Sequence, residues 1–180
     1  MIRAELGAER RAELDRLVTE RAREELDWHR YLRVLVFLPI ARQREIDTWP
    51  LIRWIWATWP RIETYVPRTD GSKMVAVRLT PDTELAENRW GIPEPVAGLL
   101  LPASEPLELI LTPLLAFDGK GHRVGYGHGY YDRFLAEQTA AERVGLGYEA
   151  LLVPDGIRAE RHDVRLHRVI TEKQIYTFAR

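Results

Sequence analysis

A long apolar run in this chain leads directly into a group of closely spaced glycines. Residues 109–117 are apolar apart from Thr112 and Pro113, a pattern typical of a strand buried on both faces of a parallel sheet. Five glycines follow within residues 119–129, and residues 130–138 have the composition of a helix, with Asp132 in its first turn. This order predicts an anion-binding site, because unpaired backbone N–H groups at a helix N-terminus can approach a phosphate.

The glycine loop matches neither of the common phosphate-binding templates. It lacks the Gly-Lys-Ser/Thr of a P-loop, and Tyr130 stands where the dinucleotide fingerprint needs its last glycine. The loop is therefore an anion site of unassigned type or, as the alternative, a tight turn without a ligand. Arg123 and Arg133 flank it, and two cations favour the anion site.

The remaining apolar periodicity predicts an α/β protein. Helical spacing indicates a helix over residues 2–29, which Gly7 can interrupt, and a second helix over residues 49–58. Strands are predicted at residues 31–38, 62–66, 74–79, 143–148, 151–154, 169–171 and 174–178, with Pro67 closing the second of these. Strands that alternate with helices favour a largely parallel sheet in one domain over residues 1–180, with residues 1–30 as an N-terminal amphipathic helix.

Composition narrows the class of protein. The 180 residues carry a net charge of −1, which gives no overall attraction to nucleic acid or to an anionic membrane. The absence of cysteine excludes disulfides, thiolate metal sites and cysteine nucleophiles. No apolar stretch has the length or position of a membrane span or a signal peptide. We expect a cytoplasmic protein that binds neither nucleic acid nor membrane.

Four tryptophans lie in or beside the predicted helix at residues 49–58. They are Trp49, Trp54, Trp56 and Trp59. An aromatic stripe at this spacing is more often part of a core than of a ligand site, but an exposed patch would favour self-association. The sequence thus predicts a monomer or a weak homo-oligomer. At the start of this helix, Asp47 or Thr48 is a candidate N-cap.

Residues 113–135, PLLAFDGKGHRVGYGHGYYDRFL, closely resemble the signature of the 5-formyltetrahydrofolate cyclo-ligase family. Residues 88–95 (NRWGIPEP) resemble a second signature, residues 45–48 (EIDT) resemble a third, and weaker similarity runs from about residue 31 to residue 171. The resemblance implies a single-domain, Rossmann-like, three-layer α/β/α fold. It also implies ATP-dependent cyclisation of 5-formyltetrahydrofolate to 5,10-methenyltetrahydrofolate, with release of ADP and phosphate.

The same resemblance implies the site residues. Those for ATP are Arg3, Arg123, Gly125, Tyr126, Gly127, His128, Gly129, Tyr130 and Arg133. Those for the reduced folate are Glu45, Pro67, Met74, Trp90, Tyr130 and Tyr131. Arg123 and Tyr131 are the implied catalytic residues. Asp132 and Asp163 are the implied ligands of Mg²⁺, which prefers few carboxylates together with phosphate oxygens.

One loop residue departs from the family pattern. His128 stands where the family usually has a small residue, so it either crowds the nucleotide or adds a hydrogen-bond donor to it. The N-terminal basic cluster of the family is also thin here. The alternative is therefore a non-catalytic or differently specific relative that binds nucleotide or folate. A phosphosugar isomerase or CoA-transferase relative would share the fold, but it does not explain the segments around Glu45 and Trp90.

Overall fold

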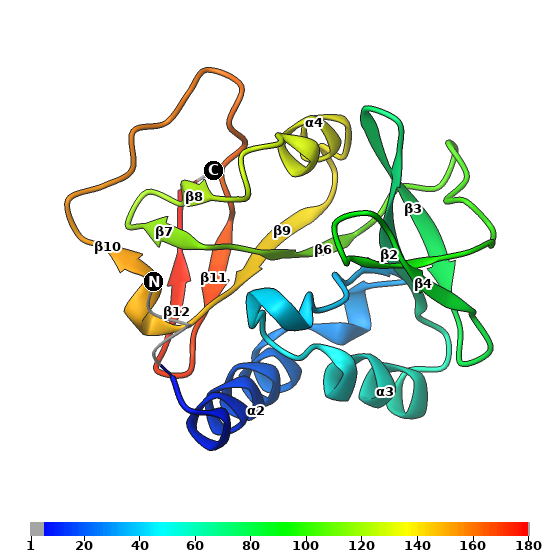
Figure 1. Cartoon of the computed structure of the whole chain (residues 1–180), viewed down its shortest axis with the longest axis horizontal. Helices are drawn as coiled ribbons and strands as arrows, with labels where there is room; N and C mark the ends of the chain where they lie inside the picture. The colour runs from blue at the N-terminus through cyan, green and yellow to red at the C-terminus, as the bar shows by residue number, and fades with distance from the viewer. Residues whose placement is uncertain (1–5, 180) are drawn as a thin grey trace.

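A seven-stranded, largely parallel sheet forms the centre of the molecule (Figure 1). The structure is a computed structural model that describes residues 6–179. The strands are β1 Arg33–Leu35, β2 Glu63–Asp70, β3 Lys73–Leu79, β6 Leu109–Pro113, β9 Glu142–Leu146, β11 Arg168–Ile170 and β12 Ile175–Thr177. Their order is β12-β11-β9-β6-β1-β2-β3, and the outermost strands β12 and β3 are antiparallel to their neighbours. The predicted largely parallel sheet is therefore confirmed.

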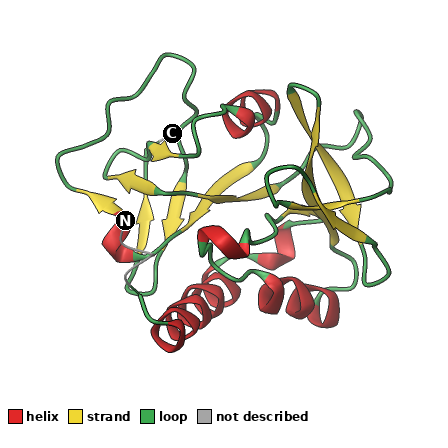
Figure 2. Ribbon diagram, viewed as in Figure 1, coloured by secondary structure: helices red, strands yellow, loops and turns green. Residues whose placement is uncertain are grey.

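Helices cover both faces of this sheet. Helices α2 (Ala8–Glu25) and α3 (Trp49–Thr58) lie together on one side, and α4 (Tyr130–Glu137) lies on the other (Figures 1 and 2). Side chains on β1 and β6 alternate between the two layers: Val34 and Leu109 pack with α2 and α3, whereas Leu35 and Ile110 pack with α4. This alternation builds the three-layer α/β/α arrangement.

The helix predicted at residues 49–58 is confirmed at both ends, and Asp47 contributes to its start. Asp47 Oδ1 accepts a hydrogen bond of 3.0 Å from the backbone N–H of Trp49. Thr48 instead donates to the carbonyl of Phe37 at 2.6 Å. The first helix is shorter than predicted: it begins after Gly7 and ends at Glu25, residues 28–30 form a 3₁₀ turn, and residues 2–5 lie outside the described part.

The prediction of one strand over residues 109–117 is wrong. The chain leaves the large sheet after Pro113 and re-enters extended structure as β7, Ala116–Asp118, in a separate small sheet. That sheet also contains β8 (Arg123–Val124) and β10 (Leu152–Val153). Residues 151–154 were predicted to continue the preceding strand. Instead, Leu152 and Val153 pair with β7. The break turns the chain out of the sheet before the glycine loop.

The sequence indicated that Pro67 closes its strand. In the structure Pro67 instead lies in the middle of β2, opposite Ala76. The carbonyl of Ala76 bonds Leu101 on its far side, so Pro67 and Ala76 form a non-hydrogen-bonded pair. The missing N–H of Pro67 would point toward β1, whose pairing with β2 already ends at Tyr65. A proline is tolerated there because no ladder hydrogen bond is lost.

The four tryptophans of the α3 region do not form an exposed patch. All four are partly buried against the core, and arginines 23, 53 and 61 lie over the rings of Trp54, Trp49 and Trp59. The indole N–H of Trp56 donates to Thr64 at 2.7 Å. Within the described residues, no helix has the length and apolar character needed to cross a membrane.

The direction of winding reverses between β1 and β6. From β1 the chain passes through α3 to β2 on one side, and from β6 it passes through α4 to β9 on the other. In open α/β sheets, ligands bind in the crevice outside the carboxyl ends of the strands at such a reversal. The loops that leave β1 and β6 at this point carry Glu45 and the glycine loop. The fold thus brings two segments singled out from the sequence to one place.

Candidate active site

The glycine loop ends in a tight turn that begins α4. Gly127 and Gly129 have φ of +83° and +64°, a left-handed region that favours glycine. Gly129 is the N-cap of α4, and a Cβ atom there would lie 2.9 Å from a guanidinium nitrogen of Arg133. Residues 125–128 are exposed, and Gly129 is half-buried. The first backbone N–H groups of α4 have no acceptor within the helix, and the anion site that the sequence indicates there stays a prediction.

Glu45 is presented by an unusual backbone conformation. A short 3₁₀ turn, Ala41–Gln43, follows β1, and Arg44 after it has φ 52° and ψ 44°. Arg44 is the one non-glycine residue with positive φ among residues 6–179, and such a residue costs roughly 1–2 kcal/mol. Glu45 itself is 6% exposed. The strain turns an acidic side chain inward, which is typical of functional positions.

Both carboxylate oxygens of Glu45 accept hydrogen bonds. The backbone N–H of Ile40 donates to Oε2 at 2.8 Å, and the hydroxyl of Tyr126 donates to Oε1 at 2.7 Å. Tyr126 belongs to the glycine loop, so this bond joins the loop after β6 to the loop after β1. The structure thus connects a predicted folate residue directly to a predicted ATP residue.

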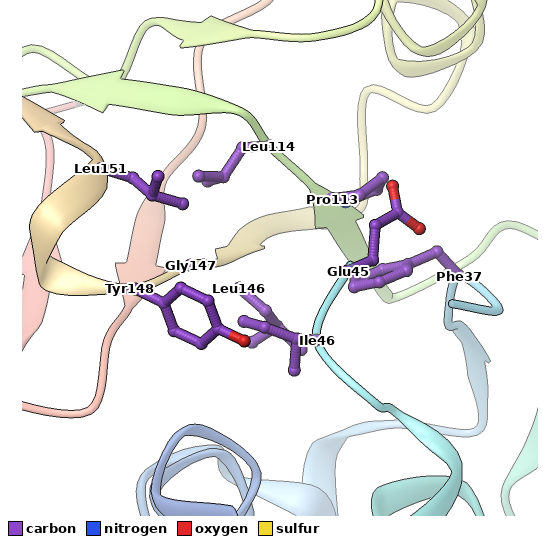
Figure 3. A pocket seen from close by; sticks show the side chains of 9 residues that line it. All are labelled: Phe37, Glu45, Ile46, Pro113, Leu114, Leu146, Gly147, Tyr148 and Leu151. Atoms are coloured by element: carbon purple, nitrogen blue, oxygen red, sulfur yellow. The ribbon is translucent and has the colours of Figure 1, made fainter. Parts of the chain in front are cut away.

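A small cavity lies beside Glu45 at the carboxyl ends of β1, β6 and β9 (Figure 3). Its volume is about 10 Å³, which suits roughly one water molecule. Its lining residues are Phe37, Glu45, Ile46, Pro113, Leu114, Leu146, Gly147, Tyr148 and Leu151. The Glu45 carboxylate lies next to Phe37 and Pro113, away from Tyr148 and Leu151. This cavity is too small for a folate or a nucleotide.

Arg123 and Asp132 form a largely buried ion pair under the glycine loop. The guanidinium nitrogen Nη2 of Arg123 lies 3.0 Å from Asp132 Oδ1, and the Arg123 side chain is 4% exposed. Nη1 of Arg123 donates to the carbonyl of Val164 at 2.7 Å, and the N–H of Val164 donates to Asp132 Oδ1 at 3.1 Å. The pair therefore fastens the long loop before β11 to β8 and to the first turn of α4.

The loop that this ion pair holds also carries Asp163. Asp163 is next to Val164, and its Oδ2 accepts a hydrogen bond of 2.7 Å from the N–H of Glu160. Asp132 Oδ2 accepts no hydrogen bond from residues 6–179. The described residues contain no group of three or more His, Cys, Asp or Glu side chains arranged to hold a metal ion. Two carboxylates suit Mg²⁺ only if phosphate oxygens and waters complete its coordination.

Three aromatic side chains gather at the other side of the loop. The ring of His128 is stacked on Tyr130 at 6.2 Å and lies edge-on to Trp90 at 6.0 Å. Trp90 is held in a turn in which Asn88 Oδ1 accepts the N–H groups of Trp90 and Ile92. Arg89 lies over the Trp90 ring at 4.1 Å. The cluster brings three aromatic rings together beside the loop, and an aromatic ligand can stack on such rings.

Tyr131 points its hydroxyl into the protein. Its ring is half-buried, but the hydroxyl is buried and has no hydrogen-bond partner in the described part of the chain. Burial raises the pKa of this hydroxyl, and the nearby charge of Glu45 raises it further. An unpaired buried hydroxyl costs free energy. The Tyr131 hydroxyl is therefore a candidate for a hydrogen bond to a ligand or a water.

The β2–β3 hairpin closes the site from the side of α4. The Tyr130 hydroxyl donates to the carbonyl of Gly71 at 3.2 Å, and Arg133 donates to the carbonyl of Ser72 at 3.1 Å. Met74 on β3 is half-buried and packs against the core layer under α4. Pro67 lies further along β2, away from the hairpin turn. Arg3 falls outside the described residues.

Comparison with known proteins assigns the chain to a family. The family model described as 5-formyltetrahydrofolate cyclo-ligase matches residues 1–172. The chain belongs to the 5-formyltetrahydrofolate cyclo-ligase family. It is 31% identical to the cyclo-ligase of Haemophilus influenzae, over 94% of this chain and 91% of the relative. It is 29% identical to that of Escherichia coli K12, over 89% and 96%.

A solved structure agrees with this assignment. The 5,10-methenyltetrahydrofolate synthetase of Aquifex aeolicus superposes with a TM-score of 0.83 and 26% identity, over 99% of this chain and 88% of the other. A synthetase of the same description from Mycoplasma pneumoniae shares the fold with a TM-score of 0.76 at 18% identity. The cyclo-ligase resemblance seen in the sequence is thereby confirmed.

Sequence reasoning missed the bonds that hold the cyclo-ligase site together. Tyr126 and Arg123 are predicted ATP residues, and the structure adds that their side chains bind Glu45 and Asp132. Asp118 was overlooked as an anchor, although it accepts hydrogen bonds from four groups. One feature of the sequence could have indicated this role of Asp118. An acidic residue at the end of an apolar, buried strand needs hydrogen-bond donors from within the protein.

Proposed function

We propose that the protein catalyses the ATP-dependent cyclisation of 5-formyltetrahydrofolate to 5,10-methenyltetrahydrofolate, releasing ADP and phosphate. The formyl oxygen attacks the γ-phosphorus and displaces ADP. N10 of the folate then attacks the activated carbon, the ring closes, and phosphate leaves. Both nucleophiles belong to the substrate, so the protein has to position the reactants and stabilise charge.

One observation carries this proposal. The glycine loop at the start of α4 and the carboxylate of Glu45 meet at the point where the sheet reverses its winding. In this proposal the loop is the anion site and Glu45 is the acceptor for an aminopyrimidine edge, and a reaction between ATP and a reduced folate needs the two side by side. Membership of the cyclo-ligase family supports the same reaction.

The glycine loop would bind the phosphates of ATP. Backbone N–H groups from Gly125 to Gly129 and the N-terminus of α4 are the donors in this proposal. Arg133 at the loop, and Arg3 in the N-terminal segment, would add positive charge. Arg123 would act on the transferred phosphoryl group while also orienting Asp132, to which it is bonded at 3.0 Å.

The reduced folate would lie between Glu45 and the aromatic cluster. Glu45 would accept hydrogen bonds from the aminopyrimidine edge, and Trp90 and Tyr130 would stack on the rings. Tyr131 would use its unpaired hydroxyl to hold the folate near the formyl group. Met74 and Pro67 would line the far wall of the same pocket.

Asp132 and Asp163 would hold Mg²⁺. The uncommitted oxygen of Asp132 fits this role, because Mg²⁺ commonly takes one or two carboxylates and completes its coordination with phosphate oxygens and waters. When bound, the ion would neutralise negative charge on the phosphates. Arg123 keeps the Asp132 carboxylate oriented, and the N–H of Val164 holds the neighbouring loop against it.

The test is direct formation of product. Purified protein is mixed with ATP, Mg²⁺ and 5-formyltetrahydrofolate, and the absorbance of the methenyl product is followed over time. We expect product and ADP in equal amounts. A folded protein that gives no product above the rate without enzyme, at saturating ATP, contradicts the proposal.

A second candidate function is binding without cyclisation. The side chains of Tyr126 and His128 extend from the glycine loop, and Tyr126 already occupies one oxygen of Glu45. A relative that only binds ligands would retain ATP and folate affinity but yield no ADP. We further propose a cytoplasmic location, which cell fractionation would test.

A further inference from the structure

The bond between Tyr126 and Glu45 joins two elements that the proposed reaction assigns to different substrates. Tyr126 lies in the glycine loop assigned to ATP, and Glu45 is the carboxylate assigned to the folate. The hydroxyl of Tyr126 donates to Glu45 Oε1 at 2.7 Å across 81 positions of sequence. A ligand that takes hydrogen bonds to Glu45 therefore acts on the loop as well.

Glu45 needs both of its oxygens for an aminopyrimidine edge. Two adjacent N–H donors of such an edge pair with the two oxygens of a carboxylate in parallel. In the structure Oε2 accepts from the backbone of Ile40, a fixed group, and Oε1 accepts from a side chain that can rotate away. Each carboxylate oxygen can accept two hydrogen bonds, so the folate edge shares Oε2 with the fixed Ile40 N–H and competes with the movable Tyr126 hydroxyl for room at Oε1.

The loop around Tyr126 has room to move. A Cβ atom added at Gly125 or Gly127, on either side of it, would meet no atom within 4 Å. Glycine at both flanks gives the backbone wide conformational freedom. The Tyr126 side chain is 39% exposed, so its release toward solvent crosses no packed core.

We propose that Tyr126 sets the affinity for the reduced folate and couples folate binding to nucleotide binding. In the ligand-free protein its hydroxyl holds the glycine loop against Glu45. The folate displaces this hydroxyl, and the released loop then closes around the phosphates of ATP. The inference rests on the proposed function and assigns Tyr126 a role distinct from a direct ATP contact.

Whether folate affinity rises or falls in a Tyr126 variant depends on whether the Tyr126–Glu45 bond is present in the free protein or in the folate complex. Tyr126→Phe removes a hydrogen bond that is present without folate and absent with it. The free protein is destabilised relative to the complex, so the variant binds folate more tightly. A hydrogen bond to a charged group corresponds to a change of about tenfold or more in the dissociation constant. A residue that merely positioned Glu45 would give the opposite sign.

The experiment is calorimetric titration of the full-length wild-type protein and the Tyr126→Phe variant. The ligands are 5-formyltetrahydrofolate and a non-hydrolysable ATP analogue, each alone and in the presence of the other. We expect the wild-type protein to bind the ATP analogue more tightly when folate is bound. In Tyr126→Phe, folate affinity rises about tenfold, and the coupling between the two ligands falls toward none.

The matched control is Tyr176→Phe. Tyr176 donates to Glu149 at 2.6 Å, a tyrosine–glutamate bond outside the glycine loop and the Glu45 segment. We expect this variant to bind both ligands as the wild-type protein does. Thermal melts of all three proteins check that each is folded.

The outcomes separate this inference from the proposed function. Folate binding that is weaker or unchanged in Tyr126→Phe overturns the inference, and so does coupling equal to that of the wild-type protein. If the wild-type protein binds both ligands but forms no methenyl product, the proposed function fails and the Tyr126 comparison still decides the inference. A wild-type protein that binds no folate overturns both.

Discussion

At the scale of single residues, Glu45 shows how the fold keeps an acid ready for a ligand. A carboxylate removed from water costs free energy unless donors satisfy its oxygens. The backbone of Ile40 and the hydroxyl of Tyr126 supply such donors. The sequence alone indicated Glu45 through its family context, but the tyrosine that pairs with it lies too far along the chain for any local pattern to reveal.

The substitution Glu45→Gln tests the role of this charge. We expect folate affinity to fall about tenfold to a hundredfold, because a charge-assisted hydrogen bond is lost while the shape is kept. Affinity for an ATP analogue should stay nearly unchanged. Equilibrium titrations measure both. Glu149→Gln, at a glutamate that also binds a tyrosine hydroxyl, is the matched control. An equal loss for both ligands would point to a damaged fold.

Asp132 is the residue on which the proposed Mg²⁺ site depends. Asp132→Asn keeps an oxygen for Arg123 and Val164 but removes the charge, so the loop before β11 stays attached. We expect turnover to fall on the order of a hundredfold, with partial recovery at raised Mg²⁺ and little change in Tm. Asp163→Asn should act in the same direction but less strongly. Wild-type turnover of Asp132→Asn at limiting Mg²⁺ would remove this aspartate from the site.

At the scale of elements, strongly patterned segments were predictable and turns away from the sheet were not. The helix at residues 49–58 follows from its apolar spacing and from Asp47. The break after Pro113 does not follow, because residues 109–117 read as one apolar run whichever sheet they join. Pro67 led to the opposite error, because a strand was predicted to end where it continues. Whether a proline ends a strand depends on whether the neighbouring strand needs its N–H, and that is known only from the tertiary structure.

Asp118 anchors the β7–β8 hairpin to the loop before β11. Its Oδ1 accepts from the N–H groups of Lys120 and His122, and its Oδ2 accepts from Ile157 at 2.9 Å and lies 3.0 Å from His122 Nδ1. Burial alone would raise the pKa of Asp118, but these hydrogen bonds outweigh it and hold the pKa below its ordinary value. With both oxygens committed, Asp118 is not free to bind a metal ion.

The stability that Asp118 contributes should depend on pH. A carboxyl whose pKa is lowered by folding stabilises the protein above its unfolded pKa, about 3.9, and this contribution is lost as pH falls through the folded pKa. We expect Asp118→Asn to lower the free energy of unfolding at pH 7 by about 2 kcal/mol. This corresponds to a Tm about 4–8 °C lower. Denaturant titrations at pH 7 and below pH 4 should show the difference shrinking with acidification.

At the scale of the whole molecule, arginines lie over the tryptophans of the α3 region, whose sequence pattern suggests a surface for self-association. Cation–π contacts of 5.6–5.7 Å place guanidinium groups over three of the four rings. Among the described residues, the exposed large apolar side chains lie elsewhere. Leu99 and Leu100 lie beside β3, and the others are Leu32, Val96, Val124 and Tyr126. Such scattered exposure is common on monomeric proteins.

We therefore expect a monomer in solution. Sedimentation equilibrium at low micromolar concentration should give a mass near 20.9 kDa. Leu99→Glu, on the most exposed of these apolar side chains, should leave that mass unchanged. A wild-type dimer that Leu99→Glu dissociates would contradict the expectation and identify the edge near β3 as the interface.

The order of strands also has a consequence for how the chain folds. β1 gains its neighbour β6 only from residues about 75 positions later, as the pairing of Val34 with Leu109 shows. Closing so long a loop before its contacts form is entropically unfavourable, which slows folding in proteins rich in distant pairings. On the ribosome, Glu45 emerges long before Tyr126. Strands β9, β11 and β12 emerge later still, so a nascent chain can place the glycine loop beside Glu45 only in the last third of its synthesis.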